Sequence, residues 1–302
     1  MTKKNRSTSR RTSAKAGQPA NLDQMRTLMT GLVMGESPRW HENRLWFSDW
    51  GTQEVVAVDL EGKSEPIVRA PSFPFCIDWL PDGRLLITSG SEGLLLRREP
   101  DRPLATHADL NGLAGTPWKD IVVDGRGNAY VGNVGFNFPA DEFAPGILAM
   151  VTPDGSVQPA ADGVAYPHGM VVTPDNSTLI LAEAYANRLT AFDIAADGSL
   201  SNRRVWADLD GGVPHGICLD AEGAVWYADI PNQRCVRVRE GGEVLHTIDL
   251  DRACFACMLG GADNRTLFMM AAEWLGPESM ADGARTGQVL TVVAPAPRAG
   301  WP

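Results

Sequence analysis

Short hydrophobic runs alternate with compact polar turns along most of the chain, and one such unit recurs six times. In each unit two apolar runs flank a turn built from Asp, Asn, Gly or Pro, which accept the backbone angles of a tight hairpin. The units begin at Glu36 (ESPRWHENRLWFSD), Phe75 (FCIDWLPDGRLLITS), Lys119 (KDIVVDGRGNAYVGN), His168 (HGMVVTPDNSTLILAE), His215 (HGICLDAEGAVWYAD) and, more weakly, Ala256 (ACMLGGADNRTLFMMA). The pattern therefore predicts six β-hairpins.

A third strand follows most of these hairpins, as in EVVAVDL, RLTAFDI and RCVRVRE. The central turn residues lie near positions 42, 82, 125, 175, 222 and 263, so the unit repeats every 40 to 50 residues. About four strands in such a period is typical of a propeller blade. We predict an all-β fold, a six-bladed β-propeller with four-stranded antiparallel blades, as a single domain over residues 23–302. Residues 21–30 form either a short helix or a lead into the first strand.

Charge and hydropathy indicate which classes of molecule the protein is expected to bind. Residues 1–20 carry six basic side chains and no acidic ones, whereas the rest of the chain carries 21 basic and 37 acidic ones. Because an acidic body repels nucleic acid, we expect a small-molecule substrate and no nucleic-acid partner. No stretch approaches the roughly 20 apolar residues of a membrane helix, and the N-terminus lacks the apolar core of a secretory signal. Residues 1–22 are predicted to be a disordered basic tail, with a nucleic-acid-binding arm as the alternative.

The five cysteines indicate a reducing, cytoplasmic setting. An odd count in a long chain argues against a disulfide framework. Cys254 and Cys257 form a CxxC pair, but their surroundings, ACFACML, are apolar. We expect buried thiols there rather than a zinc or redox pair.

The residues that open the six units carry candidate chemistry. The innermost strand of each blade lines the channel of a propeller, so equivalent positions converge near one axis. These positions are held by Glu36, Phe75, Lys119, His168, His215 and Phe255 or Ala256. Polar groups gathered in a partly buried space are unfavourable unless they pair or bind something, so the four ionisable residues predict a site on the axis.

At these residues the sequence resembles the regucalcin, gluconolactonase and luciferin-regenerating-enzyme-like family. The matching strings are GESPRW around Glu36, KDIVVDGRGNAYVGN, YPHGMVVTPDNSTLILAEAYANRLTAFDI and PHGICLDAEGAVWYAD, and the resemblance covers about residues 30–302. It implies a six-bladed propeller with one central divalent metal ion. It also implies an enzyme that hydrolyses sugar lactones or related cyclic esters.

The resemblance implies a set of metal ligands from which this chain departs. The family uses a Glu in the first blade, which Glu36 matches, an Asn in a P-N-G string and an Asp in a P-D-G string. Here the two strings read Pro167-His168-Gly169 and Pro214-His215-Gly216, so the implied ligands are Glu36, His168 and His215. Two imidazoles and one carboxylate favour zinc, iron(II) or manganese over calcium. Alternatively, the two histidines only pack and form hydrogen bonds in the channel.

The family's substrate-binding Asn-Asp pair reads Lys119-Asp120 in this chain. Asp120 is the predicted proton acceptor or hydrogen-bond partner of the substrate, and Lys119 would stabilise negative charge on it. Lys119 could instead act as a base or Schiff-base nucleophile if desolvation lowers its pKa, or form an ion pair with Asp120 or Glu36.

The ends of the second strands should rim the same mouth of the channel. Asp49, Asn133, Glu183 and Asp229 hold these positions. Asn133, Glu183 and Tyr185 are predicted to bind substrate, and Trp118 and Phe136 could join Tyr185 in a pocket wall. For the polar residues the alternative is a loop cap, and for the aromatic ones it is core packing.

The leading functional hypothesis is a metal-dependent, lactonase-type hydrolase of a small lactone or cyclic ester. A two-His-one-carboxylate site also matches a non-haem iron oxygenase, or an isomerase or lyase that uses the metal as a Lewis acid. A third hypothesis is a non-enzymatic propeller that binds a small ligand, because fold does not fix function.

Overall fold

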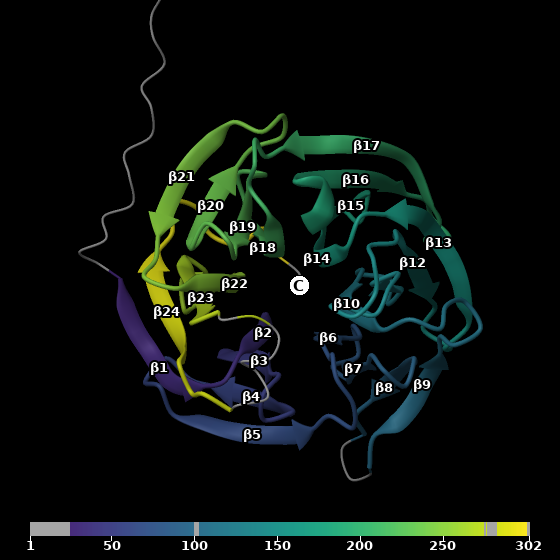
Figure 1. The fold of residues 1–302 in the computed structure, drawn as a ribbon, viewed down its shortest axis with the longest axis horizontal. Coiled ribbons are helices and arrows are strands. Elements are labelled where there is room, and N and C mark those ends of the chain that lie inside the picture. The colour runs from purple at the N-terminus through teal and green to yellow at the C-terminus, as the bar shows by residue number, and fades with distance from the viewer. Residues whose placement is uncertain (1–24, 100–102, 275, 277–282, 301–302) are drawn as a thin grey trace, which may run out of the picture.

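A computed structural model describes residues 25–99, 103–274, 276 and 283–300. Six four-stranded antiparallel sheets surround a central axis as blades (Figure 1). The predicted six-bladed β-propeller is thereby confirmed. The predicted basic tail, residues 1–22, lies outside the described residues.

Each blade runs from an inner strand beside the axis to an outer strand at the rim. Blade 1 contains β2 (Gly35–His41), β3 (Arg44–Asp49), β4 (Glu54–Val58) and β5 (Ser64–Arg69). Blade 2 contains β6 (Ile77–Trp79), β7 (Leu85–Ser89), β8 (Leu94–Arg97) and β9 (Ala105–Asp109). Blade 3 contains β10 (Trp118–Val123), β11 (Ala129–Asn133), β12 (Gly146–Val151) and β13 (Val157–Val164).

The second half of the ring follows the same plan. Blade 4 contains β14 (Pro167–Val172), β15 (Thr178–Glu183), β16 (Arg188–Ile194) and β17 (Leu200–Asp208), with the short helix η2 (Ala184–Ala186) after β15. Blade 5 contains β18 (Pro214–Leu219), β19 (Val225–Asp229), β20 (Arg234–Val238) and β21 (Val244–Asp249). Blade 6 contains β22 (Ala253–Gly260), β23 (Thr266–Ala272), β24 (Gly287–Val293) and β1 (Arg26–Leu32).

Strand β1 closes the ring. It comes from the start of the described chain and pairs antiparallel with β24, from near its end, with Arg26 opposite Thr291 and Leu32 opposite Gly287. Most of residues 21–30 that are described therefore belong to a strand, rather than to a helix or a lead-in. The partner of β1 lies about 260 residues away in sequence. Because β1 belongs to blade 6 and leads directly into β2 of blade 1, this pairing joins the last blade to the first.

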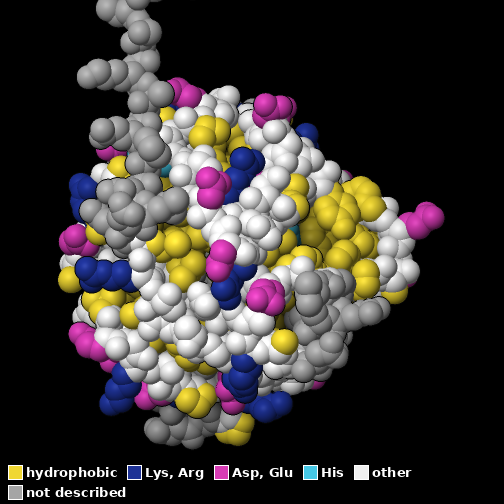
Figure 2. Space-filling view, turned by 60° about the vertical axis from the view of Figure 1, so that its left-hand side comes forward, with side chains coloured by type: hydrophobic (Ala, Val, Ile, Leu, Met, Phe, Trp, Pro, Cys, Tyr) yellow, Lys and Arg dark blue, Asp and Glu magenta, His cyan; other side chains and the backbone are white. Residues whose placement is uncertain are grey.

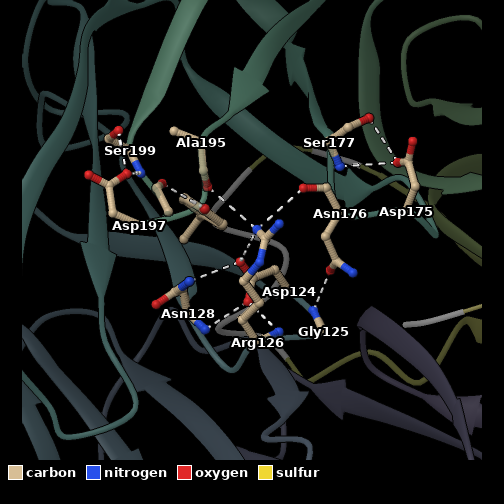
Figure 3. A network of polar contacts seen from close by, with 12 residues as sticks. Asp124, Gly125, Arg126, Asn128, Asp175, Asn176, Ser177, Ala195, Asp197 and Ser199 are labelled. Atoms are coloured by element: carbon tan, nitrogen blue, oxygen red, sulfur yellow. Dashed lines mark hydrogen bonds and ion pairs between the residues drawn. The ribbon is translucent and has the colours of Figure 1, made fainter.

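The hairpin turns between inner and second strands use the chemistry that their sequences predict. In blades 2 to 6 an aspartate carboxylate accepts a hydrogen bond from the backbone N–H two residues later. These aspartates are Asp82, Asp124, Asp175, Asp220 and Asp263. Figure 3 shows how the turns of blades 3 and 4 also bind each other, with Gly125 N–H donating to Asn176 Oδ1 at 2.5 Å.

The core lies between neighbouring blades and is built from the apolar faces of their strands. The largest fully buried side chains include Trp118, Trp226 and Tyr130. All five cysteines are free, as predicted, and all are buried, which confirms the predicted burial of Cys254 and Cys257. Charged side chains of both signs are spread over the surface in Figure 2, and hydrophobic ones gather in a patch toward the right of that view. Within the described part of the chain, no helix combines the length and hydrophobicity needed to cross a membrane.

Most inner strands carry a β-bulge at the end where the predicted site residues lie. In β10 the register shifts between Trp118 and Ile121, in β14 between Pro167 and Met170, and equivalent shifts occur in β2, β18 and β22. A bulge inserts an extra residue and re-aims the side chains around it. The Lys119-Asp120, His168-Gly169 and His215-Gly216 pairs all fall inside these bulges.

Gly169 and Gly216 allow neighbouring inner strands to approach closely near the axis. A Cβ at Gly169 would lie 2.5 Å from the backbone nitrogen of Ile217, and one at Gly216 would lie 2.5 Å from the Cβ of Ala256. Real Cβ atoms do not make contacts this short, so a side chain at either position would push two blades apart.

Gly169→Ala is therefore expected to destabilise the fold by about 1–3 kcal/mol, the usual effect of overpacking. Chemical denaturation followed by tryptophan fluorescence measures this change. Gly112→Ala is the matched control, because a methyl group there meets open space. Equal stability of the two variants would contradict the packing argument.

Candidate functional site

Five ionisable residues form a cluster at one end of the central channel. We call them the charged cluster: Glu36, Lys119, Asp120, His168 and His215. They come from the starts of the inner strands β2, β10, β14 and β18. The second strands end at the same level, since Trp118 pairs with Asn133 and Pro167 with Glu183. We call this end of the channel the mouth.

The Lys119 amine lies at the centre of the contacts within the charged cluster. Its Nζ is 2.6 Å from His168 Nδ1, 2.9 Å from His168 Nε2 and 3.9 Å from Asp120 Oδ2. It also lies 5.0 Å from the ring centroid of Trp50 and 5.8 Å from that of Tyr166. Both rings can stabilise an ammonium ion through their π faces. The side chain is thus held by a histidine, a carboxylate and two aromatic rings.

The charge states within the charged cluster follow from burial and mutual attraction. Burial alone would lower the pKa of Lys119, but Glu36 and Asp120 outweigh it and raise this pKa above its ordinary value. Lys119 is therefore an ammonium ion, which disfavours its use as a neutral nucleophile. Burial raises the pKa of Asp120, although Lys119 opposes the rise.

The carboxyl group of Glu36 has a raised pKa as well. Burial raises the pKa of Glu36 to about 8, while Lys119 lowers it and Asp120 raises it further. Desolvation disfavours the carboxylate form. Without an added cation, this residue is therefore largely protonated at neutral pH.

The two histidines face each other and are neutral. Their ring centroids are 4.0 Å apart. Burial, together with the neighbouring Lys119 charge, places the pKa of both rings well below the ordinary value, and His215 adds to the effect on His168. Neutral imidazoles keep a lone pair that can bind a metal or accept a proton.

The polar residues at the ends of the second strands bind neighbouring loops. Asn133 donates to Thr116 O at 2.7 Å and accepts from Gly135 N–H at 3.0 Å. Asp49 accepts from Met34 N–H at 3.1 Å, and Asp229 accepts from Asn232 Nδ2 at 2.9 Å. These contacts fit the loop-cap alternative.

Glu183 is likewise engaged inside the protein. Its fully buried carboxylate accepts hydrogen bonds from Ala165 N–H, Thr190, Arg188 and Arg203. Although burial opposes it, this set of partners holds the pKa of Glu183 below its ordinary value. The predicted roles of Asn133 and Glu183 in substrate binding stay predictions.

Aromatic side chains approach the charged cluster from neighbouring loops. Trp118 is fully buried in the core, whereas Tyr185 is 48% exposed and stacks on Tyr166, with ring centroids 4.8 Å apart. Neither Tyr166 nor Trp50 is among the residues that the sequence pattern predicts for the site. Their places in the sequence could have identified both residues. Tyr166 directly precedes the Pro167-His168 start of β14, and Trp50 directly follows the end of β3.

The residues of the charged cluster fit a divalent metal in donor type. The predicted ligands Glu36, His168 and His215 combine a carboxylate with two neutral imidazoles. His215 Nδ1 and Asp120 Oδ2 are buried without a hydrogen-bond partner. Such atoms are available to bind a metal ion or another ligand. As arranged, however, no three His, Cys, Asp or Glu side chains in the described ranges lie close enough to hold one ion.

Lys119 sets the condition for metal binding at His168. A metal bonds to a histidine nitrogen at about 2.0–2.1 Å, and the ammonium already lies 2.6 Å from one ring nitrogen and 2.9 Å from the other. The two cations would also repel each other. The donor set therefore fits a divalent ion when the long Lys119 side chain moves away from His168, and the metal site stays a prediction.

The fold and its buried ionisable groups define this protein as a six-bladed propeller with a cluster of ionisable side chains in its central channel. Residues 34–273 match the family described as SMP-30/Gluconolactonase/LRE-like region. The chain belongs to that family, as the sequence resemblance predicts.

Curated relatives are similar in sequence to this chain over most of its length. Regucalcin of Xenopus laevis is 29% identical over 250 residues, which are 79% of this chain and 83% of the relative. Regucalcin of Gallus gallus is 26% identical over 291 residues, 88% of this chain and 95% of the relative.

Solved structures share the fold at lower identity. A luciferin-regenerating enzyme superposes with a TM-score of 0.77 at 18% identity, covering 91% of this chain and 96% of its own. Regucalcin of Agrobacterium tumefaciens, a calcium-binding protein, gives 0.77 at 20% identity, covering 95% and 97%. A gluconolactonase of Xanthomonas campestris gives 0.72 at 21% identity, covering 94% and 99%.

Glu36→Gln should change how stability depends on pH in chelator-treated protein. The pKa of Glu36 is about 8 in the folded state against 4.5 for the ordinary carboxyl, so between these values the folded protein binds more protons than the unfolded one. Its neutral form stabilises the fold below the lower value, and this contribution is lost as pH rises toward about 8. The variant cannot lose this contribution, so its free energy of unfolding relative to that of wild type should increase with pH. One pKa unit corresponds to about 1.4 kcal/mol, so the increase should be at most roughly 5 kcal/mol.

Urea denaturation at several pH values between 5 and 9 measures this difference. Glu243→Gln, at an exposed carboxyl, is the control and should follow the wild-type profile. A constant difference between Glu36→Gln and wild type across the range would show that Glu36 ionises without a desolvation penalty.

Lys119→Met should strengthen zinc binding. Removing the ammonium relieves its repulsion of the incoming cation and frees the His168 nitrogens, so the affinity should rise at least about tenfold. Equilibrium dialysis against zinc, followed by elemental analysis, measures the affinity of protein purified without chelator or nickel resin. The exposed Lys63→Met is the control. Unchanged zinc affinity in Lys119→Met, or no stoichiometric zinc in any of the proteins, would contradict the predicted ligand set.

Proposed function

We propose that the protein is a metal-dependent hydrolase of a small lactone or cyclic ester, acting at the charged cluster. The observation that carries this proposal is the buried Lys119 ammonium beside Asp120, whose Oδ2 has no hydrogen-bond partner, at the mouth of the channel. Such a pair can accelerate ester hydrolysis, because the cation stabilises the charge that develops on the carbonyl oxygen and the carboxylate acts as a base toward the attacking water. Membership in a family whose description includes gluconolactonase supports the same reaction.

Glu36, His168 and His215 would hold the metal ion, with zinc, iron(II) or manganese favoured over calcium. When bound, the ion supplies Lewis acidity toward the ester carbonyl and toward water. The neutral state of both histidines leaves their lone pairs available for this role. Glu36 gives up its proton on binding a cation, because a ligating carboxyl must be ionised.

Lys119 and Asp120 act on the substrate. The Lys119 ammonium turns from His168 toward the carbonyl oxygen and stabilises its developing negative charge. Asp120 accepts a proton as water attacks the carbonyl carbon. The new carbon–oxygen bond forms, the ring carbon–oxygen bond breaks, and the proton passes from Asp120 to the departing alkoxide. The product is the open-chain hydroxy acid.

We also propose a cytoplasmic location and a small molecule as the main partner. The acidic body of the chain and its five free, buried thiols support both statements.

A panel of lactones assayed with a pH indicator tests the proposal. Wild-type protein should release acid from at least one lactone, and the product should be heavier than the substrate by one water molecule. His215→Ala should lose bound metal and activity together, and Asp120→Asn should lower kcat by about 100-fold or more, because it removes the base. His246→Ala, outside the charged cluster, is the control. Full turnover by metal-stripped protein, or a product of unchanged mass, would contradict the proposal.

A further inference from the structure

Five aromatic side chains from three loops form a continuous surface at the mouth. We call it the aromatic wall, and its members are Phe136, Phe138, Phe143, Tyr166 and Tyr185. The three phenylalanines lie between β11 and β12, Tyr166 precedes β14, and Tyr185 lies in η2. The ring centroids of neighbours in the wall are 4.8 to 6.3 Å apart, the range of direct aromatic contact.

The outer part of the wall is open to solvent. Phe138, Phe143 and Tyr185 are 44%, 49% and 48% exposed. In the described ranges, Phe73 is the one other large aromatic residue that is exposed, and its loop, before β6, also lies at the mouth. Exposed aliphatic residues lie elsewhere, for example Val205 and Val244 on outer strands. A contiguous set of exposed rings is unfavourable in water and commonly marks a binding surface.

The inner end of the wall reaches the charged cluster. The Tyr166 ring centroid lies 5.0 Å from that of His168, and Lys119 Nζ lies 5.8 Å from the Tyr166 ring. Tyr166 adopts a left-handed backbone conformation, with φ of 59°, which is uncommon for a bulky residue and frequent at functional sites. A ligand group on Lys119 and Asp120 would therefore have aromatic rings directly beside it.

The polar groups beside the wall favour an apolar ligand over a sugar. A sugar lactone carries several hydroxyl groups, and a binding site must supply hydrogen-bond partners for them. The amide of Asn133 is used by Thr116 and Gly135, and both carboxylate oxygens of Glu183 are used by protein groups. These two side chains, which the sequence predicts to bind substrate, are thus occupied by protein groups, whereas the rings of Phe138, Phe143 and Tyr185 are exposed.

We propose that the substrate is a lactone or cyclic ester with an aromatic or bulky apolar substituent, which stacks on the aromatic wall while the ester group lies at Lys119 and Asp120. This inference rests on the proposed function for the ester part and on the wall for the substituent. Sugar lactones would be poor substrates.

Three lactones with the same ring test the substituent: δ-valerolactone, δ-phenyl-δ-valerolactone and glucono-δ-lactone. Wild-type protein should hydrolyse the phenyl compound with the highest kcat/KM, by about tenfold or more over δ-valerolactone. In the double variant Phe143→Ser, Tyr185→Ser, the ratio of kcat/KM for the phenyl compound to kcat/KM for δ-valerolactone should fall by about that factor. Val205→Ser, Val244→Ser, with the same kind of exposed change on outer strands, should behave as wild type.

Binding of a lactam that is not hydrolysed, 6-phenylpiperidin-2-one, tests stacking on the aromatic wall independently of the proposed hydrolysis. If calorimetry shows that it binds wild type more tightly than the double variant while no lactone is hydrolysed, the proposed reaction is wrong and the ligand class stands. Equal lactam affinity for both proteins, or a preference for glucono-δ-lactone, overturns the inference. A wild-type dimer that becomes a monomer in the double variant also overturns it, because the wall would then join two copies of the chain.

Discussion

The crowding of six inner strands around one axis is the constraint on which the rest of this structure depends. Neighbouring inner strands come so close that Gly169 and Gly216 have no room for a Cβ. At the mouth end most of these strands carry a β-bulge, which breaks the strict alternation of side chains. Close approach and bulges together bring Lys119, His168 and His215 to one place from three different blades.

Burial at that place controls the chemistry of the charged cluster. Low solvent access makes an isolated charge unfavourable, so the groups depend on one another. Asp120 helps to raise the pKa of Lys119, which keeps its proton, whereas both imidazoles are neutral beside the ammonium. The same ammonium holds the position that a metal ion would need at His168. A metal ion would therefore have to compete with protons and with Lys119 for this set of donors, so its binding would depend on pH.

Two kinds of residue lie at the rim of the mouth: polar residues that hold loops in place, and exposed aromatic residues. Asp49, Asn133, Glu183 and Asp229 hold loops through hydrogen bonds to neighbouring backbone and side chains. The long loop between β11 and β12 and the helix η2 supply three exposed rings, those of Phe138, Phe143 and Tyr185. Under the proposed function, the composition of these loops, and not the shared fold, would decide which ligand the channel accepts.

The sequence by itself determined the blade count, the hairpins and the convergence of Glu36, Lys119, His168 and His215, because strand periodicity and turn chemistry are local properties that repeat. It did not reveal that Arg26–Leu32 closes the last blade, since that pairing joins the two ends of the described chain. Nor did it reveal that Glu183 is held by Arg188 and Arg203, or that Lys119 lies against His168. Only the tertiary structure decided these points, because packing between blades selects one partner for each polar group from several that the sequence allows.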